Sequence, residues 1–563
     1  MRRSRSILTN IRSLLAAVAF CGVLFVPQPA SAQDNAAPAA DSLRGIVVDA
    51  VSGQPIAHAL VELNQQFAVL TSGDGQFSFD GLPAGDYQAS IRKPGYWSVG
   101  YGSGIVSGSR SSLPPRPVRP VRVGPDTPAL TFRLTPLSVI VGHVTLSTSD
   151  PSDGIQVTAY TRRMENGRMR WVSAATARTR SDGSFRIGGL ASGSYKIYTQ
   201  PSLDLDRPLR DNSSPLWGYP AVYYPGVTDP SAAGVIALGP GQQALADISL
   251  VRQQFFEITA LVRAGTDQAA NFQVLDSGGR QTMLPISYDR RTQIVTASVP
   301  NGSWSLEAHS YGHEILWGRS DFQVAGAPVS LAISLLPIPR IPVIIRRDFV
   351  ASADSSQPQT SGPGMNLFLV AADDFAMSGY GGGINSVDGS NRQDWEIRVM
   401  EPGHYWVQAT AFAPTYVSSL TTGGVDLAAN PLVIVPGTTP APIEVTLRND
   451  GGTITGTIAG QSLPAGDSGA STTQQTEVLV YAIPLFPSPG NVPTKFVQLN
   501  RQFTISNLAP GSYRVIACDT PQEIDFHSPE GLATWAGKGE TVTVDAGGSA
   551  HVELTLLSTG GAP

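Results

Sequence analysis

The chain has 563 residues, which is too long for one ordinary domain. Hydrophobic residues make up 41% and charged residues 15%, so the chain can bury apolar surface and is not disordered throughout. The formal net charge of −6 argues against nucleic acid as a partner, because a phosphate backbone is held by an excess of Lys and Arg.

The first 32 residues have the pattern of a secretory signal peptide. Four arginines precede a mostly apolar run over residues 14–26, and Ala30-Ser31-Ala32 provides a small-x-small cleavage site. The run is shorter than the roughly 20 apolar residues that span a bilayer. We expect cleavage before Gln33, export to the periplasm, the outer surface or the medium, and no transmembrane segment in the mature chain. Cys518 would then be the only mature cysteine, which excludes an intrachain disulfide.

One pattern recurs along the whole mature chain. It is Gly-x-aromatic, with a bulky residue ten positions before the aromatic residue. The aromatic residues are separated by 108, 109, 101 and 108 residues, and they are Tyr87, Tyr195, Trp304, Tyr405 and Tyr513. A fixed period of this kind is the mark of a repeated structural unit, so we expect five units.

Each unit opens and closes with a β-branched or alternating run. The opening runs are 45–48, 139–144, 258–262, 342–345 and 453–458, and the closing runs are 130–134, 246–250, 331–335, 443–447 and 552–556. Period-two alternation buries one face of a strand, and apart from a short helical turn near 529–536 no helical periodicity is present. The prediction is an all-β tandem array of about five antiparallel β-sandwich domains of transthyretin-like or Ig-like type. The expected domains 1 to 5 are residues 43–136, 138–253, 255–337, 340–449 and 451–559.

The first unit explains the residue types of the repeat. Asp74-Gly75 provides the positive φ angles of a tight hairpin turn, and Phe77 and Phe79 then point to the same face of the sheet. Tyr87 should place its ring in the core and its hydroxyl on the backbone, as in a tyrosine corner.

The same stretch resembles the carboxypeptidase regulatory-like domain. The residues that carry the resemblance are Gly45-Ile46-Val47-Val48-Asp49, Ser52 to Val61, Asp74-Gly75-Gln76-Phe77 and Gly85-Asp86-Tyr87. The resemblance extends to 139–200 and, in part, to 452–558. It implies a transthyretin-like, carbohydrate-binding-like sandwich in a bacterial secreted protein. It does not imply a peptidase, since the family's module lies beside a zinc carboxypeptidase domain, and such a site needs a large α/β domain that the strand pattern of this sequence does not predict.

Other motifs give no catalytic, metal or cofactor site. On a helix, the imidazoles of His309 and His313 beside the carboxylate of Glu314 could bind a metal ion. Gly312 between them favours a loop turn instead. The Gly466–Gly469 segment imitates a serine protease motif without a histidine partner. Residues 113–120 are proline-rich and favour a stiff extension over a docking motif. The isopeptide bond of the related adhesin fold requires a lysine on the first strand, and no unit has one.

Seven aromatic residues near strand ends form the candidate ligand-binding set: Tyr96, Trp97, Tyr101, Trp217, Tyr219, Tyr223 and Tyr224. Exposed rings would stack on a sugar, whereas buried rings would cover the end of a sandwich, and the second interpretation is favoured. We expect a non-catalytic envelope scaffold or binding protein that presents its loops along an extended chain. Two alternatives stay open: a carbohydrate-binding protein, and an accessory subunit of an envelope peptidase or transporter. The expected partner is a polysaccharide or another envelope protein, with no cofactor.

Overall fold

The computed structural model describes residues 41–98, 105–106, 109–110, 121–124, 127–165, 167–204, 215–263, 270–310, 315–350, 362–372, 380–387, 394–399, 401–438, 440–459, 477–498, 501–519 and 521–557. The predicted leader, Tyr101, residues 113–120, His313 and residues 466–469 lie outside this part of the chain. Among the described residues, no helix has the length and apolar character needed to cross a membrane.

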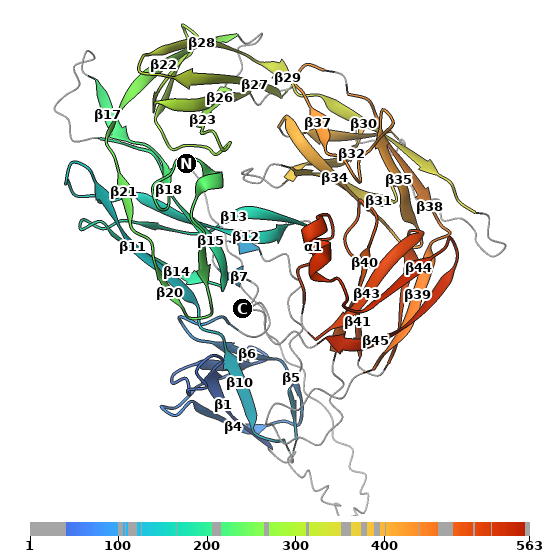
Figure 1. Ribbon diagram of the computed structural model, residues 1–563. Helices are drawn as coiled ribbons and strands as arrows, with labels where there is room; N and C mark the ends of the chain where they lie inside the picture. Colours follow the sequence, from blue (N-terminus) through green and yellow to red (C-terminus); the bar gives the residue numbers. More distant parts are fainter. Residues whose placement is uncertain are drawn as a thin grey trace, which may run out of the picture.

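The described chain is a tandem array of β-sandwich domains, as predicted (Figure 1). Five main hydrophobic cores follow one another along the sequence, and their buried residues span 43–134, 140–250, 255–335, 341–447 and 454–554. A short helix, α1 (Pro529–Thr534), lies where the sequence predicts a helical turn. The fully buried residues of each core come from one unit of the sequence repeat, because a two-layer sandwich needs the inward faces of strands from both ends of its unit.

The opening and closing strands of every unit are neighbours and run parallel. The pairs are β1 (Asp41–Asp49) with β10 (Leu130–Leu134), β11 (Ser138–Leu146) with β20 (Gln243–Leu245) and β21 (Ile248–Leu250), β22 (Gln253–Arg263) with β28 (Val329–Ser334), β30 (Arg340–Arg347) with β38 (Ile443–Arg448), and β39 (Gly452–Ala459) with β45 (Ser549–Leu557). Most other pairs are antiparallel. Each unit is therefore a mainly antiparallel sandwich in which the first and last strands of the unit pair in parallel.

The repeated aromatic residue forms the same corner in all five units. The tyrosine hydroxyl donates to the carbonyl oxygen four residues earlier in four units, at 2.8 Å for Tyr87, 2.7 Å for Tyr195, 2.6 Å for Tyr405 and 2.7 Å for Tyr513. In domain 3 the indole N–H of Trp304 donates to the carbonyl of Pro300 at 2.9 Å. The predicted corner is thus confirmed, and an indole can replace the phenol because both present a donor at the end of a buried ring.

A glycine on the opening strand explains why three units keep a phenylalanine. Gly45 lies opposite Phe77 of β4 (Gln76–Leu82), and the same pairing joins Gly142 to Phe185 and Gly456 to Phe503. A Cβ atom on any of these glycines would lie 2.2–2.4 Å from a carbonyl oxygen of the closing strand and 2.5–2.9 Å from the ring. In domains 3 and 4 the equivalent residues, Ile294 and Trp395, lie opposite Leu261 and Val343 and are only partly buried. The weak repeat in these units reflects the missing Gly–Phe pair.

Two arrangements differ from five independent sandwiches. β16 (Ser202–Leu203) and β17 (Leu216–Tyr219) precede the predicted boundary at 253, yet they extend the sheet of domain 3 through β22. In domain 4, β32 (Tyr380–Ser386) pairs with both β31 (Met365–Ala371) and β33 (Trp395–Val399), so nine strands form one continuous sheet. The hairpin turn of domain 1 also differs slightly, since Gly75 alone has a positive φ, of 74°.

Domains 2 to 5 curve around a centre that one hairpin crosses (Figure 1). The hairpin consists of β12 (Gln156–Glu165) and β13 (Arg168–Arg178), and its tip reaches domains 4 and 5. Neighbouring domains also contact through the backbone, with Gly437 N–H donating to Pro337 O at 3.1 Å and Ala409 N–H to Pro489 O at 2.9 Å. The expected extended presentation is therefore wrong for domains 2 to 5, because domain 2 contacts domains far from it in sequence.

Candidate functional site

The predicted ligand-binding aromatic residues do not form one platform. Tyr219 and Tyr223 are 5% and 1% exposed, so both rings lie inside the protein. The hydroxyl of Tyr219 lies 2.8 Å from Thr148 Oγ1. The ring of Tyr223 packs 5.0 Å from that of Tyr198. Tyr219 belongs to the domain 2 core, whereas Tyr223 lies in a separate buried cluster with Tyr198 that contacts Arg280 of domain 3.

The other described members of the set are partly exposed and belong to two regions. Tyr96 packs against the core of domain 1, and Trp97 donates its backbone N–H to Thr135 O at 2.8 Å. Trp217 lies in β17 with the guanidinium of Arg252 5.1 Å from its ring centroid, and Tyr224 packs against the domain 2 core. Sugar stacking by these four rings stays a prediction.

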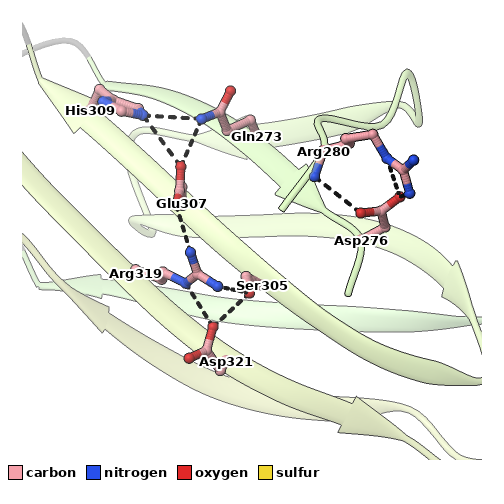
Figure 2. Close-up of polar contacts among 8 residues, drawn as sticks. All are labelled: Gln273, Asp276, Arg280, Ser305, Glu307, His309, Arg319 and Asp321. Atoms are coloured by element: carbon pink, nitrogen blue, oxygen red, sulfur yellow. Dashed lines mark hydrogen bonds and ion pairs between the residues drawn. The ribbon is translucent and has the colours of Figure 1, made fainter. Parts of the chain in front are cut away.

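A buried ion pair fixes domain 3 against domain 2, and it was not predicted from the sequence. Arg280 donates from Nε and Nη2 to Asp276 Oδ2 at 3.1 and 2.6 Å, with the two side chains 5% and 11% exposed (Figure 2). The guanidinium carbon also lies 4.4 Å from the ring centroids of Tyr198 and Tyr223. The Gly278-Gly279 turn predicts a loop, but no sequence pattern links it to tyrosines 57 to 82 residues earlier. Breaking one half of a buried pair would leave an uncompensated charge, so this contact fixes the orientation of the two domains.

A second polar network lies on the outward face of the domain 3 sheet. Along β26 (Gly302–Ser310), Leu306 and Ala308 point into the core, while Ser305, Glu307 and His309 point to the other face. These three polar side chains are nevertheless buried, at 5–6% exposure. His309 therefore lies in a strand, and the predicted loop turn is wrong at this position because β26 continues to Ser310 in register with β27 (Leu316–Val324).

The network is charged but internally paired (Figure 2). Glu307 accepts from Gln273 Nε2 at 2.8 Å and lies 3.3 Å from Arg319 Nη1 and 3.8 Å from His309 Nε2. Arg319 also donates to Asp321 at 2.8 Å. Within the described part of the chain, no group of three His, Cys, Asp or Glu side chains is placed to hold a metal ion. With each charged group held by a neighbour across the strands, the network can fix strand register and orient an imidazole.

The tip of the β12–β13 hairpin brings three domains together. The guanidinium carbon of Arg168 lies 3.4 Å from the ring centroid of Trp406 in domain 4. Gly167, whose φ of 77° disfavours a side chain, packs closely on domain 5, since a Cβ atom would lie 3.1 Å from the Phe526 ring and 3.4 Å from the imidazole of His527. A cavity of about 480 Å³ adjoins this contact and is lined by hairpin residues such as Met164 and by residues around α1. The contact is a docking site between parts of one chain.

Burial at this contact perturbs two cationic groups. It lowers the pKa of His527 to about 3, with the positive charge of Arg168 acting in the same direction. It also lowers the pKa of Arg168 to about 10, against the opposing effect of the Asp525 carboxylate. His527 is therefore neutral and Arg168 charged at neutral pH, which suits the cation–π contact with Trp406.

Comparison with known families identifies one domain. Residues 42–134 match the family model of the carboxypeptidase regulatory-like domain. Domain 1 carries this fold. The predicted resemblance is confirmed there, and the match does not extend to the other four domains. No curated protein matches the chain.

Three solved structures similar to the chain share little sequence with it. The TIE protein of Bacillus anthracis is 14% identical, with 53% of this chain aligned to 50% of that chain and a TM-score of 0.16. GBS52, the minor pilin of Streptococcus agalactiae, is 15% identical over 38% of this chain and 95% of its own, with a TM-score of 0.18. The shaft pilin SpaA of Lactobacillus rhamnosus GG is 11% identical over 36% and 98%, with a TM-score of 0.13. The fold assignment rests on the strand order and cores described above.

Proposed function

We propose that this protein is a non-catalytic, exported scaffold or binding protein of the bacterial envelope, in which domains 2 to 5 are held in a closed arrangement. The observation that supports the proposal best is the hairpin tip, where Arg168 lies on Trp406 and Gly167 packs against Phe526 and His527. A long hairpin that links domains across the centre fixes the relative positions of loops on all four domains. Fixed loops present a recognition surface at lower entropic cost than loops on a flexible string.

The charged groups at the interior support the same proposal. The ion pair of Asp276 and Arg280 and the network around Glu307 consist of side chains that hold one another. Groups arranged for catalysis would instead leave an acid, base or nucleophile facing a substrate pocket. The predicted leader supports export.

An accessory role beside an envelope peptidase or transporter is the second candidate, and it is favoured by the regulatory-like family of domain 1. Stacking of sugars on Trp97 and Trp217 is the third, favoured by their partial exposure.

Three measurements test the proposal. The full chain, expressed in a bacterial host, should be recovered outside the cytoplasm with Gln33 at its N-terminus. The purified protein should show no turnover on peptidase, esterase and glycosidase substrates. Small-angle X-ray scattering should give a compact particle for the wild type and a larger radius of gyration for the Arg168→Ala, Trp406→Ala double variant. Turnover that a point substitution in this chain abolishes, or identical scattering from both proteins, contradicts the proposal.

A further inference from the structure

A cationic groove lies on the outer face of one sheet of domain 2. In this sheet, β11 runs between β14 (Ser184–Leu190) and β20. Val141 of β11 pairs with Arg186 on one side and Leu245 on the other, and His143 pairs with Ser184. The neighbouring residues Ile140 and Val144 are buried in the core, so Val141 and His143 face outward. One row across three strands thus presents a guanidinium beside two apolar side chains.

This face is hollowed and bordered by further arginines. The hollow has a volume of about 330 Å³. Arg178 and Arg180, at the end of β13, line it together with His143 and Arg186. The three arginines are exposed, and Leu245 is 62% exposed. Small-molecule sites in proteins begin at about this size, roughly 300 Å³.

The three arginines of the groove form no ion pair within the described chain, whereas His143 at its edge lies 3.7 Å from Asp247. No ion pair joins Arg178, Arg180 or Arg186 to a carboxylate among the described residues. The nearby carboxylates have other partners: Asp247 accepts from the backbone N–H of His143 at 2.9 Å, and Asp182 accepts from that of Ser184 at 2.9 Å. Three guanidinium groups around one hollow repel one another, and an anion placed among them would remove that repulsion.

The chemistry of the lining indicates the kind of anion. A guanidinium group presents a planar fork of donors that matches a carboxylate in bidentate geometry. Val141 and Leu245 form an apolar strip beside the forks, which can contact the C–H face of a pyranose ring. We propose that this groove binds an acidic oligosaccharide, a sugar chain with carboxylates on its rings. Nucleic acid fits less well, because three arginines neutralise few phosphates and the chain as a whole carries a net charge of −6.

The groove proposal rests on the binding function proposed above and names the class of ligand. It involves none of the predicted loop aromatic residues. It also differs from sugar stacking in its electrostatics. Binding at this groove should weaken as salt is raised, since the guanidinium groups are exposed to solvent.

Titration calorimetry of the full chain with tetragalacturonate tests the site. We expect saturable binding, no binding of neutral maltotetraose, and a loss of affinity of about tenfold for each guanidinium removed in Arg180→Gln and Arg186→Gln. Arg178 is not a useful target, because Nη1 already donates to Gly154 O at 3.0 Å. Arg133→Gln is the matched control, since Arg133 is an exposed strand arginine of domain 1 and its removal should leave the affinity unchanged.

Titrations with other anions test whether the groove prefers an acidic sugar. Inorganic phosphate and phosphatidylglycerol vesicles should bind at least tenfold more weakly than tetragalacturonate. Vesicle binding of equal strength would assign the groove to a lipid surface and overturn the proposal. Absence of tetragalacturonate binding, or binding that survives both arginine substitutions, overturns it as well. Because the closed particle is measured separately by scattering, a negative titration with a compact particle refutes the groove alone.

Discussion

Acid should open the contact between the β12–β13 hairpin and domain 5. When the hairpin is docked, burial and the charge of Arg168 hold the pKa of His527 at about 3, against an ordinary value of 6.5. The undocked state therefore binds a proton more readily than the docked state between these two pH values. Docking is at full strength above pH about 6.5 and weakens as the pH falls towards 3.

The size of the effect follows from the two pKa values. At pH 4.5 an undocked imidazole would be about 99% protonated, and the docking equilibrium would fall by about a hundredfold. Partial exposure of the ring screens its charge, so we expect a decrease between about tenfold and a hundredfold. Glu523 acts in the opposite direction, because burial raises the pKa of its carboxyl. The lowering of the pKa of His527 is the larger of the two effects, so the histidine decides the sign.

Small-angle scattering between pH 7.5 and 4.5 measures the opening as an increase in the radius of gyration. His527→Gln keeps a neutral polar side chain at all these pH values, so this variant should stay compact. Glu523→Gln removes the opposing group and should open at a higher pH than the wild type. If His527→Gln expands with the same pH dependence as the wild type, the reasoning is refuted.

Three further predictions concern packing. Tyr195→Phe removes the corner hydrogen bond to Ala191 and should destabilise domain 2 by about 1 kcal/mol, seen as a lower unfolding temperature of the full chain; an unchanged temperature would contradict the role of the corner. Gly142→Ala places a methyl group 2.2 Å from a backbone carbonyl and should lower the free energy of unfolding by more than about 2 kcal/mol. In the control variant Gly188→Ala the methyl group meets only the flexible end of an arginine at 3.0 Å, so the free energy of unfolding should be nearly unchanged. Equal losses of stability in the two variants would contradict this prediction. Cys518 is fully buried with its pKa raised to about 12 by burial, so iodoacetamide should label it only after unfolding, and rapid labelling of the native protein would show that the site is open.

Local patterns were sufficient to predict the repeated features. The Gly-x-aromatic spacing predicted five corners because a buried ring with a donor at its tip requires a carbonyl close in sequence, and the structure provides it four residues earlier each time. The opening and closing runs predicted strands because alternation is a local property. Their parallel pairing was not predicted, since nothing local indicates which of two distant strands will be neighbours.

The candidate site was predicted poorly for the same reason. Tyr219 and Tyr223 look like loop aromatics in sequence, and only the packing of Tyr223 against Tyr198 and Arg280 shows that they are interior. The arginines of the groove are separated by Asp182 and by uncharged residues in the chain, so they form no basic run. They meet because β14 pairs with β11 and because the end of β13 lies beside them.

The sequence by itself determined the strands, the corners and the number of units, because each depends on residues within about ten positions of one another. The tertiary structure decided the closed arrangement of domains 2 to 5, the burial of His527 under the hairpin, and the gathering of the arginines on one face. These features depend on contacts between residues separated by as many as 360 positions, such as Gly167 and His527, and on the loss of solvent that such contacts cause.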